Sequence, residues 1–151
     1  MKKLMMLIVV SLFCLTGCGN ETKTMTCTRS MNQNGLGMDL RYEVEYSKDT
    51  VTKVKSIEKV TSSSKDVLEN YKEAVEAIYE PYKDVEHYNY DLKIDGDTLT
   101  STLEVDYSKV DTKKMIEIDS ANGQLIKDGK IKIDDIKAMY ESSSVGATCT
   151  K

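Results

Sequence analysis

The 151-residue chain has no tryptophan and only one phenylalanine, one proline and one histidine. The phenylalanine, Phe13, lies in an N-terminal apolar segment, so the rest of the chain must build its core from Val, Ile, Leu, Met and nine tyrosines. Such a core is modest, and a covalent brace would stabilise it. Serine–histidine or cysteine–histidine catalysis would have to use His87, and no Gly-x-Ser-x-Gly motif surrounds any serine. We therefore expect His87 to be a surface residue without a catalytic role.

Long apolar runs are also missing. Spanning a bilayer takes roughly 20 apolar residues, whereas the longest apolar stretch is the twelve-residue segment Leu4 to Leu15. This segment follows Lys2 and Lys3, and a basic start before a short apolar core is typical of a secretory signal peptide.

The sequence Leu15-Thr16-Gly17-Cys18 then matches the lipobox of bacterial lipoproteins. Leu15 fills an apolar subsite of the signal peptidase, Gly17 is small enough to permit cleavage before Cys18, and the Cys18 thiol accepts a diacylglyceryl group. We therefore predict a signal peptide over residues 1–17, cleavage between Gly17 and Cys18, and a lipid anchor at Cys18. The alternative is a plain signal peptide with a chance cysteine.

Two acyl chains on one cysteine give stable anchoring, so the mature protein is expected on the extracytoplasmic face of the cell membrane. Residues 18–23 are short and polar, as expected of a tether, and residues 24–151 are the length of a single domain. The net charge is −4 and becomes more negative once Lys2 and Lys3 are removed. An acidic domain argues against binding to nucleic acid or to anionic lipids through a basic patch.

The remaining cysteines have distinct predicted fates. Cys14 leaves with the signal peptide, whereas Cys27 and Cys149 lie in alternating segments near opposite ends of the domain. If the first and last strands are neighbours, the two thiols can form a disulfide outside the cytoplasm; two buried free thiols are the alternative. Two cysteines and one histidine lack the paired spacing of a zinc site, and we expect no metal and no cofactor.

Period-two alternation predicts strands over residues 24–31 and 38–46. A third strand is predicted over residues 50–61 from its β-branched residues. Its apolar residues Val51, Val54, Ile57 and Val60 recur every third position, which requires a bulge to bring them onto one face.

Helical periodicity predicts a helix over residues 65–80, with Ser63 and Asp66 spaced as in a capping box and Pro81 ending it. Strands over residues 87–94 and 98–107 follow as a hairpin. A turn at Asp95-Gly96 would pair Leu92 with Leu99, and a turn at Gly96-Asp97 would pair Ile94 with Leu99; both keep apolar residues opposite each other.

Residues 108–130 form an irregular stretch, with a short turn or strand around residues 113–118 and a loop at 120–123. Asp134 can cap a second helix over residues 135–142, and residues 145–149 alternate like a last strand. The expected architecture is α+β, an antiparallel sheet of about five to six strands with two helices packed on it.

Two groups of residues are candidates for function. Glu104 and Asp106 share a polar strand face and could perform acid–base chemistry, although a solvated face explains them as well. Five tyrosines lie on apolar strand faces, where they would be core residues or, if helices leave the sheet partly uncovered, line a groove for a peptide, sugar or lipid: Tyr42, Tyr46, Tyr88, Tyr90 and Tyr107.

Several segments together resemble the YehR-like small lipoproteins of the bacterial envelope: the lipobox, the Thr-rich segment around Cys27, "DLRYEVEYSKDTVTKV", "YEPYKD", "LEVDYSKVDTKKM", "QLIKDGKIKIDDIK" and the C-terminal cysteine. The resemblance implies a lipid-anchored α+β domain and no known activity or active-site residues.

We therefore expect no enzymatic activity and interpret the chain as an anchored module that binds an unknown envelope protein or small ligand. One alternative is a small carrier or chaperone for a lipid or peptide that uses the tyrosine face. The other is an envelope enzyme with an unrecognised site that includes Glu104, Asp106 or His87.

Overall fold

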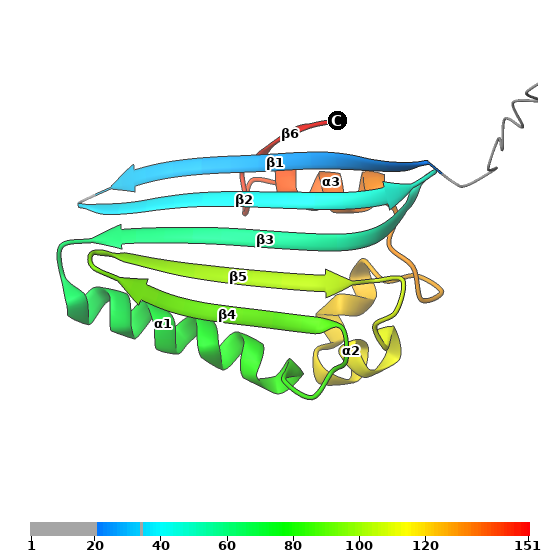
Figure 1. The fold of residues 1–151 in the computed structure, drawn as a ribbon. Helices are drawn as coiled ribbons and strands as arrows, with labels where there is room; N and C mark the ends of the chain where they lie inside the picture. Colours follow the sequence, from blue (N-terminus) through cyan, green and yellow to red (C-terminus); the bar gives the residue numbers. More distant parts are fainter. Residues whose placement is uncertain (1–20, 34) are drawn as a thin grey trace, which may run out of the picture.

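A computed structural model describes residues 21–33 and 35–151. The predicted signal peptide, the cleavage position at Gly17 and the anchor at Cys18 lie outside the described residues. The described chain forms a six-stranded antiparallel sheet of order β4-β5-β3-β2-β1-β6 (Figure 1). The strands are β1 Thr22–Gln33, β2 Leu36–Ser47, β3 Thr50–Ser62, β4 Tyr88–Asp95, β5 Thr98–Asp106 and β6 Thr148–Thr150.

The α+β prediction is confirmed, with three α-helices rather than two: α1 Lys65–Tyr79, α2 Thr112–Ile118 and α3 Ile133–Glu141, together with the 3₁₀ turns η1 Glu80–Tyr82 and η2 Ser120–Gln124. Helix α2 occupies the segment that the sequence assigned to a turn or strand. Its seven residues are too few to display a helical period, and it begins because the Asp111 carboxylate accepts hydrogen bonds from the backbone N–H groups of Lys113 and Lys114.

The other two helices are not capped as predicted, although α1 begins at Lys65 as expected. Ser64 is the N-cap of α1 without a side-chain capping hydrogen bond, so the expected capping box is absent. Helix α3 begins at Ile133 with Lys132 as N-cap, which places Asp134 in the first turn rather than at the cap. The backbone N–H of Ile133 donates to the carbonyl of Asp49 at 2.9 Å, so the β2–β3 turn holds this helix end.

The predicted irregularity in β3 is present at Thr52. Glu45 pairs with Lys53, but the next residue, Tyr46, pairs with Val51, so Thr52 is an extra residue that brings Val51 and Val54 onto the same face. Ile57 was wrongly placed with them. It pairs with Arg41 on one side and Thr102 on the other, which puts it on the opposite face of the sheet.

The β4–β5 hairpin adopts the second of the two predicted registers. Ile94 pairs with Leu99 and Tyr90 with Leu103, around a turn at Gly96-Asp97 in which Gly96 has a φ of 63°. A positive φ is accessible to glycine without steric cost. His87 precedes the strand rather than starting it.

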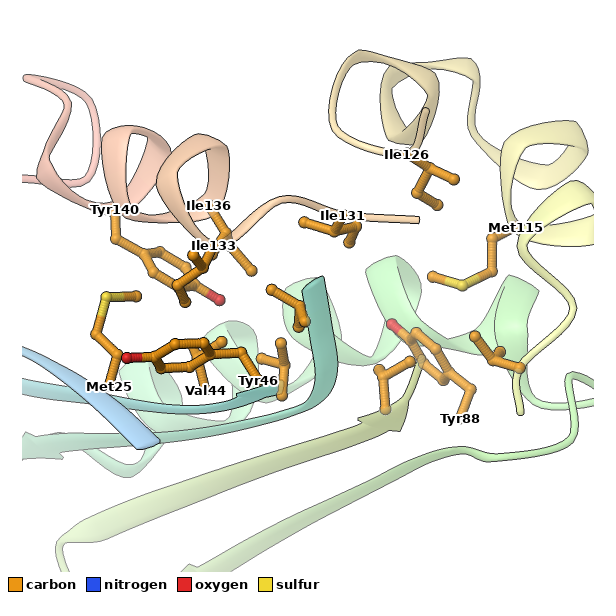
Figure 2. Packing of buried hydrophobic residues seen from close by; sticks show 14 of the residues in the cluster. Met25, Val44, Tyr46, Tyr88, Met115, Ile126, Ile131, Ile133, Ile136 and Tyr140 are labelled. Carbon is orange, nitrogen blue, oxygen red and sulfur yellow. The ribbon is translucent and has the colours of Figure 1, made fainter. Parts of the chain in front are cut away.

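The helices cover one face of the sheet, and the hydrophobic core lies between the two layers. Most of the core packs strands against α2, α3 and the segment between them, with Met25, Val44 and Tyr46 facing Ile133, Ile136 and Tyr140 (Figure 2). A smaller cluster of Val60, Leu68 and Leu99 lies under the start of α1. The other sheet face has no helix over it in the part of the chain that is described, as alternation in β2 predicts.

The two ends of the domain are joined covalently. Cys27 on β1 pairs directly with Cys149 on β6, and a disulfide links them. The prediction that the first and last strands are neighbours therefore agrees with the structure.

Candidate binding surfaces

The uncovered face of the sheet carries columns of opposite charge. Glu43 and Glu45 on β2 pair in register with Lys55 and Lys53 on β3, and Lys55 in turn pairs with Glu104 on β5. The Lys53 ammonium lies 2.6 Å from the Glu104 carboxylate, which raises the pKa of Lys53. Opposite charges on facing strand positions stabilise a sheet modestly and leave a surface that is polar but nearly compensated.

This face is also hollowed. A concavity of about 390 Å³ lies over β1, β2, β3 and β5, and its lining includes Thr24 and Thr26 beside the charged side chains. We call this the open-face hollow. Arg41, at its border, forms a 2.8 Å ion pair with Glu43. The hollow therefore offers hydroxyls and charges of both signs, suited to a polar partner rather than an apolar one.

The predicted acid–base candidates lie on this face but are engaged in other interactions. Glu104 is paired with Lys53, and the Asp106 carboxylate accepts from the Ser108 hydroxyl and contacts the Lys109 ammonium at 2.9 Å. These two partners lower the pKa of Asp106 to about 2. Asp106 is therefore ionised at neutral pH and poorly suited to exchange a proton near pH 7.

His87 contacts Asp106 through a backbone hydrogen bond. Its carbonyl accepts from the N–H of Asp106 at 3.0 Å, and the residue has a φ of 66°. The side chain is exposed, in agreement with a surface histidine.

The five tyrosines predicted on apolar strand faces all lie on the helix-covered side. Tyr46 and Tyr88 are buried, whereas Tyr42, Tyr90 and Tyr107 are half-buried. Tyr88 stacks on Tyr82 with ring centroids 4.7 Å apart. Burial raises the pKa of Tyr107 to about 12. Most of these rings are core residues, and none lines the open-face hollow.

A cluster of polar and aromatic side chains between α1 and the sheet was missed by the sequence analysis. The Tyr71 hydroxyl on α1 donates to the Glu58 carboxylate on β3 at 2.6 Å. Burial first, then the hydrogen bond to Glu58 and the negative charge of that carboxylate, raise the pKa of Tyr71, so its hydroxyl remains a donor. Tyr42 and Tyr79 complete what we call the Glu58 cluster; burial first and the Glu58 charge in addition raise the pKa of both tyrosines.

Glu58 was missed because Ile57 was assigned to the buried face. Alternation counted back from Val60 alone would have placed Glu58 and Ser56 on the covered side, as the register does.

Neither a metal site nor a membrane span is found in residues 21–33 and 35–151. No group of three or more His, Cys, Asp or Glu side chains there is arranged to hold an ion. No helix in the same part of the chain has the length and apolar character needed to cross a bilayer.

Comparison with known proteins gives one family. A model of the family described as "Protein of unknown function (DUF1307)" matches residues 21–144. A protein of Listeria monocytogenes named uncharacterized lipoprotein Lmo0207 is 27% identical over 139 residues, which cover 89% of this chain and 87% of that protein.

Two solved structures share the fold. The NMR structure of Escherichia coli YehR has a TM-score of 0.55 at 21% identity and covers 85% of this chain and 92% of its own. The NMR structure of a protein from Streptococcus pneumoniae TIGR4 has a TM-score of 0.53 at 16% identity, covering 99% and 98%. The resemblance to YehR-like lipoproteins is confirmed, and at these identities the solved structures inform the fold alone.

Proposed function

Because this chain belongs to the DUF1307 family of proteins of unknown function, we propose that it is a lipid-anchored module on the extracytoplasmic face of the membrane. It binds another component of the cell envelope and does not catalyse a reaction. The lipobox ending at Cys18 and the lipoprotein name of the Listeria relative support the anchor.

The position of β1 determines which end of the anchored domain lies near the membrane. The strand begins at Thr22, inside the predicted tether of residues 18–23 and four positions after Cys18, so the remaining link reaches at most about 14 Å. The strand then runs for 12 residues, which corresponds to roughly 40 Å at about 3.3 Å per residue. The start of β1 and the β2–β3 turn are thus held near the membrane, while the β1–β2 hairpin can reach away from it.

The observation that carries the binding function is the open-face hollow. A sheet face left free of helices, with hydroxyls and charges of both signs around a concavity, offers many hydrogen-bonding groups to a polar partner. The engaged carboxylates of Glu104 and Asp106 support binding over catalysis.

Two experiments on the full chain in intact cells test this proposal. Cell fractionation of Cys18→Ala should show unprocessed protein that is no longer acylated; equal processing and acylation of the variant would contradict the anchor. A photo-crosslinking residue at Thr26 should capture a partner, whereas the same residue at the exposed control position Glu73 on α1 should not. Equal yields from both positions would remove the argument for the hollow.

A second candidate is a carrier for a lipid or peptide on the helix side. Val67 and Ile78 on α1 are large apolar side chains that are 40% and 62% exposed. Tyr71 shares their flank of the helix, because positions 67, 71 and 78 lie on one side at 3.6 residues per turn.

A further inference from the structure

Glu58 is an acidic side chain on the apolar side of the sheet. It lies on the central strand β3, directly between Leu40 on β2 and Ser101 on β5. Among the described strand positions that face the helices it is the only carboxylate, and it is half-buried. Placing an ionised group there is costly unless it is paired.

Glu58 has no cationic partner in the described part of the chain. The ion pairs within residues 21–33 and 35–151 do not include it, and its hydrogen-bond donor, the Tyr71 hydroxyl, is uncharged. Arg29 lies in the same row of the sheet, next to Leu40, but its guanidinium donates to the carbonyl of Val145 and lies against Gly146. Arg29 is therefore held by the Val145 carbonyl and makes no ion pair with Glu58, although its charge reaches Tyr42.

The surroundings of Glu58 are aromatic and apolar. Tyr42 pairs with Ser56 and is thus the diagonal neighbour of Glu58 on β2. Tyr71 lies over the carboxylate from α1, and its flank of that helix continues into exposed Val67 and Ile78. Tyr42, Tyr71 and Glu58 all keep part of their surface accessible.

We propose that Glu58, Tyr71 and Tyr42 form a binding site for a small molecule that carries an alkylated ammonium group. A carboxylate without an ion-pair partner among the described residues attracts the positive charge, and tyrosine rings attract weakly hydrated cations. A plain ammonium is strongly hydrated and would enter such a site less readily, whereas methyl groups suit the apolar flank. This inference rests on the proposed binding function and gives it a ligand class, at a surface separate from the open-face hollow.

The test is a titration of the full chain in a non-ionic detergent with tetramethylammonium chloride, followed by two-dimensional NMR. Sodium chloride at equal ionic strength and methylammonium chloride are the comparison ligands. We expect saturable shifts centred on Glu58, Tyr42 and Tyr71, at least tenfold weaker binding of methylammonium, and no saturation with sodium. Glu58→Gln, which retains an oxygen to accept from Tyr71, should lose at least tenfold in affinity, while Glu73→Gln, at the exposed control position on α1, should bind as the wild type does.

Tyr71→Phe is the second variant, because it keeps the ring and releases the carboxylate from its hydrogen bond. Its affinity should equal or exceed that of the wild type. Shifts that are absent, or that are unchanged in Glu58→Gln while the fold is intact, would overturn the site. Equal affinity for methylammonium would overturn the preference for an alkylated group. If tetramethylammonium fails to bind but Thr26 still captures a partner, only this inference fails and the proposed binding function stands.

Discussion

Tyr42 on β2 stacks on Tyr140 of α3, with ring centroids 4.1 Å apart and planes within 15° of parallel. Tyr140 is almost fully buried, and Tyr42 is half-buried. The stack fastens α3 to the middle of the sheet, at a place where the chain has no tryptophan or phenylalanine to fill the space. Two sequence-distant segments thus meet through a pair of tyrosines, beside aliphatic side chains such as Val44 and Ile136.

Tyr140→Ala should lower the free energy of unfolding by about 3–5 kcal/mol, as for other large aromatic truncations in a core. Tyr140→Phe keeps the ring and should lose far less. A double-mutant cycle with Tyr42→Ala, measured by urea denaturation, should give a coupling of about 0.5–1.5 kcal/mol. The same cycle between Tyr140 and Tyr90, which instead contacts Tyr79, is the control and should be additive; coupling in both cycles would contradict a local stack.

The disulfide between Cys27 and Cys149 should contribute a large share of the stability. It joins residues 122 positions apart, and in the chain-entropy model closing so long a loop stabilises the fold by up to about 5 kcal/mol. Cys149→Ala should lower the urea midpoint strongly, and reduction of the wild-type protein should reproduce that loss. Thr148→Ala, at the neighbouring exposed position of β6, is the matched control and should unfold near the wild-type midpoint. A Cys149→Ala variant within 1 kcal/mol of wild type would contradict this role.

Most of the sheet could be predicted from the sequence because one of its faces is solvated. Strands with one buried and one solvated face alternate between apolar and polar residues, and this alternation identifies β2 and the β4–β5 hairpin. For the hairpin it allows two registers, and the structure adopts one of them. The choice between them depends on tertiary packing: pairing Tyr88 with Val105 sets the Tyr88 ring against Tyr82 of η1.

The features that could not be predicted from the sequence are each determined by one or two residues. The bulge at Thr52 brings Val51 into phase with Val54, but from Val54 to Val60 the strand alternates regularly, so Ile57 lies on the uncovered face and Glu58 faces the helices. Grouping the apolar residues at every third position placed Ile57 on the buried face instead. Helix α2 was hidden for a different reason, since its identity comes from one capping carboxylate rather than from a repeating pattern.

As a helix cap, Asp111 should therefore contribute more to the free energy of unfolding than Ser64, the N-cap residue of α1. Its carboxylate accepts from two backbone N–H groups of α2, at 3.0 and 3.1 Å, whereas Ser64 at the start of α1 makes no side-chain capping bond. Asp111→Ala should cost about 0.5–2 kcal/mol, and Ser64→Ala only a few tenths. Chemical denaturation of the two variants compares them directly, and equal losses would show that the cap does not stabilise α2.

The stability of the fold should also depend on pH through Asp106. Its folded-state pKa of about 2 lies below the value of about 3.9 expected in the unfolded chain, because the Ser108 hydroxyl and the Lys109 ammonium favour the ionised form. A depressed carboxyl pKa stabilises the native state above the unfolded pKa, and that contribution is lost as the pH falls from about 4 to about 2. Since the group lies near the surface, we expect its ionised form to contribute no more than about 1 kcal/mol to the free energy of unfolding.

Asp106→Asn should be destabilised at pH 7 and match the wild type near pH 2, whereas Asp91→Asn, an exposed position on β4, should show no such convergence. A difference between Asp106→Asn and wild type that stays constant from pH 7 to pH 2 would mean that the substitution acts through packing rather than through charge.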